Sequence, residues 1–365
     1  MPRFLALDVF RGMTVCFMII VNTSGNYETT YAPLMHANWH GFTPADLVFP
    51  SFLFAVGNAM SFAMLKWTGL AQSAVLWKIF KRTALIFLLG YLLYWFPFVH
   101  PEKDQWVFND IAHTRIFGVL QRIALCYGIA ALMIYYLSPK WVLSLTVLLL
   151  VAYKFLLTGF GDLSLEGNAV LKLDKWLIGE NHLYHGEGIA FDPEGLLSTL
   201  PALGNVVFGY FAGRYILQKG KTYEGLTHLL FAGMLLMLLA YFWHSSFPVN
   251  KKLWTSSFVL LTAGIDLVIL AAIIYIIDFL RKTRWTYFFE VFGKNPLFIY
   301  LASEMGVTLM WTFSIGDQEL YSWLYKNLFQ HAGDYSGAFL FALWWMLTCW
   351  LLGWWMDKKR IYVKV

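Results

Sequence analysis

Long apolar runs, separated by short polar segments, dominate this 365-residue chain. A helix needs about 20 mostly apolar residues to cross roughly 30 Å of hydrocarbon. Runs of about this length occur at residues 5–24, 44–65, 83–99, 116–137, 141–160, 194–216, 226–243, 254–280, 286–312 and 336–356. The pattern predicts an all-α, polytopic transmembrane bundle of about ten helices. No separate soluble domain, linker or internal repeat is evident, so residues 1–365 are expected to form a single domain.

The connections between these runs differ in charge, and the difference predicts the orientation in the membrane. Lysine and arginine collect on the cytoplasmic side of membrane proteins. Basic residues gather in every second connection, at Lys66, Lys78, Lys81, Arg82, Lys140, Arg214, Lys219, Lys221, Arg281, Lys282 and Arg284. We therefore expect these segments to be cytoplasmic, together with both termini, which carry Arg3 and the basic tail 357–365. The loops 25–43, 100–115, 161–193, 244–253 and 313–335 are expected on the opposite side.

Composition agrees with this picture, since 59% of the residues are hydrophobic and only 13% are charged. Such a chain is too apolar for a soluble globular domain. The three cysteines, Cys16, Cys126 and Cys349, lie inside apolar runs, so neither a disulfide framework nor a thiolate metal site is predicted. The first run has no small-residue cleavage site after it and is expected to be a retained helix, not a signal peptide.

The segment YAPLMHANWHGFTPADLVFP, residues 31–50, leads into the second predicted helix. Thr43, Pro44 and Asp46 fit the N-cap, N1 and N3 positions of a capping box, which gives Asp46 a structural explanation. His36 and His40 have no such role. A histidine at a membrane boundary is commonly a hydrogen-bonding residue, but its unperturbed pKa also suits proton transfer near neutral pH. Both interpretations remain open on this pattern.

Several ionisable or amide side chains fall within the predicted spans, where each is costly and indicates either a function or a paired partner. Asp8 and Arg11 lie one helical turn apart and either pair with each other or offer Arg11 to a phosphate. The other members of this group are Gln121, Arg122, Asp266, Lys294, Asn295 and Glu304. The Gly and Pro residues around Lys294 and Asn295 also predict an interrupted helix. We favour a polar passage between helices over a set of isolated bridges.

Two weaker signals concern metal binding and packing. The loop HLYHGEGIAFDPE contains His182, His185, Glu187 and Asp192, whose residue types suit a divalent ion but whose spacing matches no helix-borne motif, so no metal is predicted. The same loop ends in Asp-Pro-Glu, which is typical of a helix start. Gly209 and Gly213 form a small-xxx-small pair that indicates close packing within the bundle or in a homodimer.

A family resemblance is carried by the segments LDVFRG, HANWHGFTPADLVFP, GVLQRIALCY, HLYHGEGIAFDPEG, VNKKLW and GKNPLFIY, in this order. They resemble the heparan-α-glucosaminide N-acetyltransferase family over about residues 3 to 305. The resemblance implies a transmembrane acetyltransferase that uses cytoplasmic acetyl-CoA to acetylate a glucosamine-type amine on the other side of the membrane. It also implies a bacterial homologue in the inner membrane.

The resemblance assigns roles to particular residues. His36 matches the active-site histidine of the family motif and is expected to act as general base, whereas His40 has no counterpart there. Asn22 matches an asparagine shortly before it and is either an oxyanion donor or a helix C-cap. With Asp46, these are the expected catalytic residues. The residues expected to bind the donor are Arg11, Arg122, Lys294 and Asn295.

The sequence therefore predicts an enzyme whose partners are acetyl-CoA, an aminosugar acceptor and the lipid bilayer, with no nucleic acid and no metal. The alternative is an aminosugar transporter, or a transport accessory protein, in which the same polar residues line a translocation path. Transporters often contain inverted repeats and paired broken helices. Only one clear Gly/Pro break is present, which favours the enzyme. A structural scaffold would leave the charges within the spans unexplained.

Overall fold

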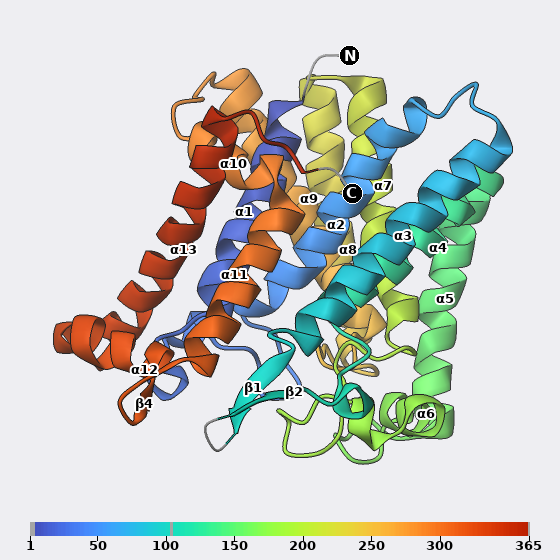
Figure 1. Ribbon diagram of the computed structural model, residues 1–365. Helices are drawn as coiled ribbons and strands as arrows, with labels where there is room; N and C mark the ends of the chain where they lie inside the picture. The colour runs from blue at the N-terminus through green and yellow to red at the C-terminus, as the bar shows by residue number, and fades with distance from the viewer. Residues whose placement is uncertain (1–3, 103–104, 364–365) are drawn as a thin grey trace.

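The computed structural model describes residues 4–102 and 105–363, so Arg3 of the predicted cytoplasmic face lies outside the described residues. The predicted all-α bundle is confirmed (Figure 1). Its long helices are α1 (Leu5–Asn22), α2 (Pro44–Leu65), α3 (Gln72–Trp95), α4 (Val119–Tyr136), α5 (Pro139–Phe160), α7 (Thr199–Lys219), α8 (Tyr223–His244), α9 (Ser256–Ile274), α10 (Thr286–Lys294), α11 (Pro296–Thr312) and α13 (Asp334–Lys358). Seven of the described helices are long and apolar enough to cross a membrane: α1, α2, α4, α5, α8, α9 with its π-helical extension to Phe279, and α13.

The remaining predicted spans correspond to α3, α7 and the pair α10 and α11, with two corrections. Helix α3 begins at Gln72, not at residue 83, because the basic residues Lys78, Lys81 and Arg82 lie on the helix and not in the connection before it. The predicted span 286–312 is two helices, since the chain leaves helical geometry at Asn295. The interruption lies where the Gly and Pro residues predict it.

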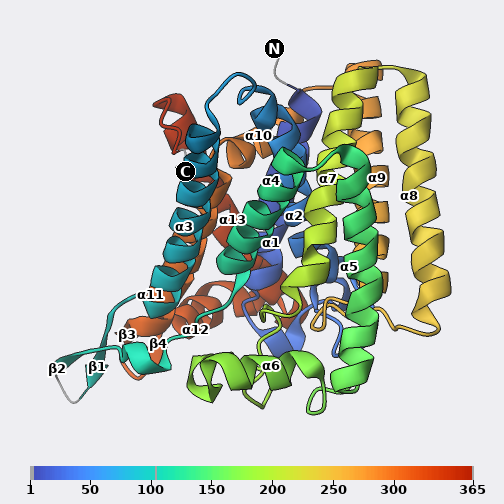
Figure 2. The same cartoon turned by 90° about the vertical axis from the view of Figure 1, so that its right-hand side faces the viewer.

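Several short elements that the sequence did not predict lie at one end of the bundle. They are α6 (Ala169–Ile178), α12 (Leu320–Leu324), and the antiparallel hairpins formed by β1 (Val99–Glu102) with β2 (Gln105–Phe108) and by β3 (Ser314–Ile315) with β4 (Gln318–Glu319). Figures 1 and 2 show these elements at the end opposite the two chain termini. The termini therefore share one end, as expected from the charge pattern. Which side of the membrane that end faces stays a prediction.

Close helix contacts through glycine hold α2 against α7. A methyl group added at Gly57 would lie 1.8 Å from the carbonyl oxygen of Val206, and one added at Gly209 would lie 2.0 Å from that of Phe54. Gly213 faces Asn58 and Ser61 of α2 in the same way. The Gly209 and Gly213 pair thus packs within the chain. Small residues allow two helix backbones to approach this closely.

The same device holds α1 against the end of α10. The nearest atom to a methyl group at Gly12 would be the carbonyl oxygen of Phe289, at 1.8 Å, and at Gly293 it would be that of Asp8, at 2.4 Å. Helix α1 also contacts α2, α11 and α13. Helix α1 therefore packs against helices from both the N-terminal and the C-terminal parts of the chain.

We predict that Gly57→Ala lowers the thermal stability of the purified protein, because an added methyl group in a fully packed contact costs about 1–3 kcal/mol. Gly159→Ala in α5 is the matched control, since no atom lies within 4 Å of the added carbon there. Melting temperatures in detergent compare the two variants. Equal melting temperatures would show that the contact between α2 and α7 is not tight.

Candidate functional site

A cavity of about 460 Å³ opens at the end of the bundle opposite the termini, between α1, α2, α3, α4, α11 and the loops there; we call it the distal cavity. Its walls include the aromatic rings of Phe49, Tyr94, Tyr184 and Tyr300. Its acidic, basic and imidazole lining residues are His36, Arg115, Glu187, Glu194, Lys251, Lys252 and Glu304. Apolar walls with a few convergent polar groups are typical of a small-molecule site.

His36 and Asp46 form the centre of this site. The Nδ1 atom of His36 lies 2.9 Å from Oδ1 of the fully buried Asp46. The other oxygen of Asp46 accepts from the backbone N–H groups of Ala37, at 3.2 Å, and Thr43, at 3.0 Å. Asp46 thus caps α2, as the spacing of Thr43, Pro44 and Asp46 predicts, and also contacts the ring of His36. A carboxylate at Nδ1 leaves the lone pair of a neutral imidazole on Nε2.

Lys251 completes the cluster from the loop between α8 and α9. Its Nζ atom lies 3.0 Å from Nδ1 and 3.1 Å from Nε2 of His36, and 3.7 Å from Oδ1 of Asp46. Burial lowers the pKa of His36, and the charge of Lys251 lowers it further, while the bond to Asp46 acts in the opposite direction. Burial also lowers the pKa of Lys251. The lowered pKa of His36 favours the neutral imidazole, which is the form that can accept a proton.

Arg115 organises the other wall. Its guanidinium group donates to both oxygens of Asp192, at 2.8 and 2.7 Å, and to Glu194, at 2.6 Å. It also lies over the rings of Tyr94 and Tyr184 at 4.8 and 4.7 Å. The Asp-Pro-Glu segment is therefore not a helix start, because α7 begins only at Thr199 and Arg115 anchors the segment instead. Bidentate pairing of this kind fixes both partners firmly.

Asn22 lies at the last position of α1, on the cavity wall. Its side-chain nitrogen donates to Oε1 of Glu304 in α11 at 3.4 Å, and its backbone carbonyl accepts from the hydroxyl of Tyr27 at 2.8 Å. The amide thus faces the cavity with a partner from another helix. The role of Asn22 as an oxyanion donor stays a prediction.

A second cavity, of about 560 Å³, lies between α1 and α2 near the termini; we call it the proximal cavity. Its polar lining residues are Asp8, Arg11, Asn58 and Lys66. Arg11 donates to Asp8 at 2.9 Å and, through Nε at 3.0 Å, to the carbonyl oxygen of Gly293. The predicted contact with Asp8 is therefore present, and Arg11 also binds the end of α10.

The other predicted donor-binding residues contact different parts of the chain. Arg122 is buried, donates to the carbonyl oxygen of Gly195 at 3.1 Å and to Ser198, and lies over Trp254 at 4.7 Å. Lys294 pairs with both oxygens of Asp357 at 2.8 Å. Neither Arg122 nor Lys294 lines either cavity.

Asn295, at the break between α10 and α11, also lies outside both cavities. Its side chain donates to the carbonyl oxygen of Ile361 at 2.9 Å and accepts from the N–H of Val363 at 2.9 Å. It therefore ties the C-terminal segment to the break.

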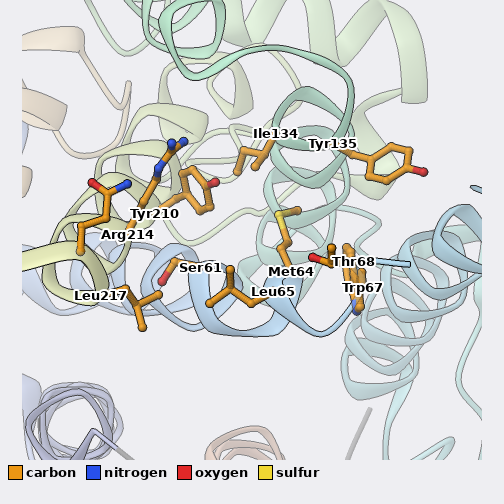
Figure 3. Close-up of a pocket in the computed structure, with 11 residues that line it drawn as sticks. Ser61, Met64, Leu65, Trp67, Thr68, Ile134, Tyr135, Tyr210, Arg214 and Leu217 are labelled. Carbon is orange, nitrogen blue, oxygen red and sulfur yellow. The ribbon is translucent and has the colours of Figure 1, made fainter. Parts of the chain in front are cut away.

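A third cavity, of about 550 Å³, lies on the other side of α2, between α4 and α7 (Figure 3). Arg214 is the one charged side chain among the described residues that line it, and Tyr210 lies beside it on the same helix. Arg214, one of the basic residues expected on the cytoplasmic side, thus lines a cavity near the termini.

The loop that carries metal-type residues is divided among other contacts. Glu187 pairs with Lys252, Asp192 with Arg115, and the ring of His182 with the carbonyl oxygen of Thr114 at 2.8 Å. Within residues 4–102 and 105–363, no group of three or more His, Cys, Asp or Glu residues is arranged to hold a metal ion.

The sequence did not predict Lys251, Arg115 and Glu194 as site residues. A signal existed for Lys251, which lies in the segment VNKKLW that carries the family resemblance. Its contact with His36 spans 215 residues of sequence, so no local pattern reveals it. Arg115 lies alone at the end of a loop and has no comparable signal.

Comparison with known proteins supports the predicted family. The model for "Heparan-alpha-glucosaminide N-acetyltransferase, catalytic" matches residues 3–245. Human heparan-alpha-glucosaminide N-acetyltransferase is 26% identical over 427 aligned positions, which cover 100% of this chain and 60% of the human protein. The mouse protein of the same name is 27% identical over 366 positions, or 83% of this chain and 53% of the mouse protein. The chain spans little more than half the length of these relatives, and it belongs to the heparan-alpha-glucosaminide N-acetyltransferase catalytic family.

Proposed function

We propose that this protein transfers the acetyl group of acetyl-CoA, bound at the cytoplasmic end, to the amine of a glucosamine-type sugar in the distal cavity. The observation that supports this most directly is the cluster of His36, Asp46 and Lys251 on the wall of that cavity. The two mammalian relatives are named as N-acetyltransferases of a glucosaminide, which fits this chemistry. The membrane that we propose for it is the bacterial inner membrane.

Both cavities lie along the seam between α1 and α2, and this seam offers a route for the donor. Helix α1 contributes Arg11 to the proximal cavity and Met18 to the distal one, and α2 contributes Ala55 and Phe49 in the same order. At 1.5 Å per residue, the seven residues from Arg11 to Met18 span roughly 10 Å. The thin, flexible pantetheine arm of CoA therefore has to pass only this stretch of packed side chains to reach from one cavity to the other.

The charges of the donor explain why its phosphates stay at one end of the bundle while its pantetheine arm enters the bundle. The phosphates of CoA are too costly to move through hydrocarbon, where even one charged side chain costs several kcal/mol. Arg11 and Lys66 offer the charge-assisted hydrogen bonds that hold phosphate near the termini. The pantetheine arm then carries the thioester along the seam towards His36.

Acetyl transfer can proceed directly between the thioester and the amine. The acceptor arrives as an ammonium ion, which cannot attack until it loses a proton to Nε2 of His36. The amine nitrogen then bonds to the thioester carbonyl carbon, and the oxyanion accepts a hydrogen bond from Asn22. Collapse of this intermediate breaks the C–S bond, the nitrogen sheds its remaining extra proton, and CoA leaves as a thiolate that takes up a proton.

We predict that His36→Ala lowers the rate of acetyl transfer by about 10² to 10⁴, the usual contribution of a positioned general base, with little effect on donor binding. His40→Ala is the matched control, because His40 contacts Asn250 at 3.3 Å and does not line the cavity. Purified protein, labelled acetyl-CoA and a panel of aminosugars give the rates. A dispensable His36 beside an essential His40 would remove His36 from the mechanism.

We predict that Lys251→Met moves the acid limb of the pH–rate profile to higher pH. Loss of the positive neighbour favours protonated His36, so the pKa of His36 rises and the neutral base is lost at higher pH as the solution is acidified. The other charged groups that affect His36 are Asp46 and Glu194, and both raise the pKa of His36. Lys252→Met, which removes a neighbouring lysine paired with Glu187, should leave the limb in place. An acid limb that stays where it is in Lys251→Met, or moves to lower pH, would contradict this account.

A further inference from the structure

Most carboxylates around the distal cavity already have a basic partner. Glu187 pairs with Lys252, Glu194 pairs with Arg115 at 2.6 Å, and Asp46 contacts His36 and Lys251. Glu304 is different. In the described part of the chain no lysine, arginine or histidine nitrogen lies within 4.0 Å of its carboxylate, and its side-chain contact is the amide of Asn22 at 3.4 Å.

The position of Glu304 inside the bundle makes a carboxylate without a basic partner energetically costly. It lies in α11, eight residues before the helix ends at Thr312, or roughly 12 Å along the helix axis. A carboxylate inside a membrane-spanning bundle is expensive unless it is paired, and residues of this kind mark binding sites by default. Glu304 lines the distal cavity, so a cation can reach it from the open end.

We propose that Glu304 is the binding partner of the ammonium group of the acceptor, a primary amine carried by a sugar. This inference rests on the proposed acetyl transfer and adds the residue that recognises the acceptor. An ammonium ion donates charge-assisted hydrogen bonds to a carboxylate, and these bonds are stronger than those between neutral groups. The neighbouring rings of Tyr27 and Tyr300 offer apolar faces for a sugar ring.

The contact between Glu304 and Asn22 connects recognition with chemistry. A nitrogen held by Glu304 lies beside the Asn22 amide, which is the proposed donor to the oxyanion. The ammonium ion gives one proton to His36, and the remaining N–H bonds keep the amine on Glu304 while its lone pair attacks the thioester. The acetylated product is a neutral amide, so it loses the ionic contact with Glu304 and can leave.

Binding of two sugars to the full chain in detergent, without donor, tests this assignment. Isothermal titration compares glucosamine, which is cationic, with N-acetylglucosamine, which is neutral. We expect the wild-type protein to bind glucosamine more tightly than N-acetylglucosamine. Glu304→Gln should raise the dissociation constant of glucosamine about tenfold or more, the loss expected for a charged hydrogen bond, and should leave that of N-acetylglucosamine unchanged.

Glu187→Gln is the matched control, because it removes the same charge from the same cavity at a residue that already has a lysine partner. It should leave the preference for glucosamine in place. Should Glu304→Gln not fold, Glu304→Asp keeps the charge but withdraws it by one methylene group, and we expect a smaller loss of glucosamine affinity. Unchanged glucosamine binding in the Glu304 variant, or an equal loss for both sugars, would overturn the assignment.

The transfer assay separates this inference from the proposed function. If wild-type protein binds glucosamine through Glu304 but moves no label from acetyl-CoA, the proposed transfer fails while the ammonium site stands. If the label moves and Glu304→Gln lowers only the maximal rate, leaving the acceptor Michaelis constant unchanged, Glu304 positions Asn22 and the ammonium site is overturned.

Discussion

The buried carboxylate of Asp46 is the interaction on which the distal site depends. It accepts hydrogen bonds from the backbone of Ala37 and Thr43, lies 2.9 Å from the ring of His36, and caps the first turn of α2. A buried carboxylate is tolerated only when its oxygens accept hydrogen bonds or pair with a cation in this way. The same residue therefore sets where α2 begins and where the imidazole points. Removing it would disturb the helix and the histidine together.

Pairing of charges is also the constraint that shapes the rest of the cavity. Arg115 holds Asp192 and Glu194 in place, so the segment before α7 is fixed by a side chain from the loop before α4. Lys251 lies against His36, where its charge opposes protonation of the ring. Most cationic and anionic side chains of the cavity form ion pairs with one another. The fold can therefore hold many charged groups at the edge of a membrane. Glu304, which has no basic partner among residues 4–102 and 105–363, therefore stands out from the other carboxylates of the cavity.

The sequence predicted what depends on local pattern. The apolar runs predicted the helices, and the spacing of Thr43, Pro44 and Asp46 predicted the helix start that places His36 ahead of it. Contacts between distant segments have no local pattern, so the lysine that meets His36 from 215 residues away was missed. The start of α3 was also missed, because hydropathy finds the part of a helix that suits lipid and not the basic turns that extend beyond it.

In the proposed reaction the acetyl group crosses the bundle while the rest of the donor does not. The most direct measurement uses oriented proteoliposomes with acetyl-CoA only on the face that carries the termini and a membrane-impermeant glucosamine conjugate only on the other. We expect acetylated conjugate on the far side and free CoA retained on the near side. Acetylation only when both substrates share one face would contradict it, and so would unmodified aminosugar crossing the membrane with no acetylated product.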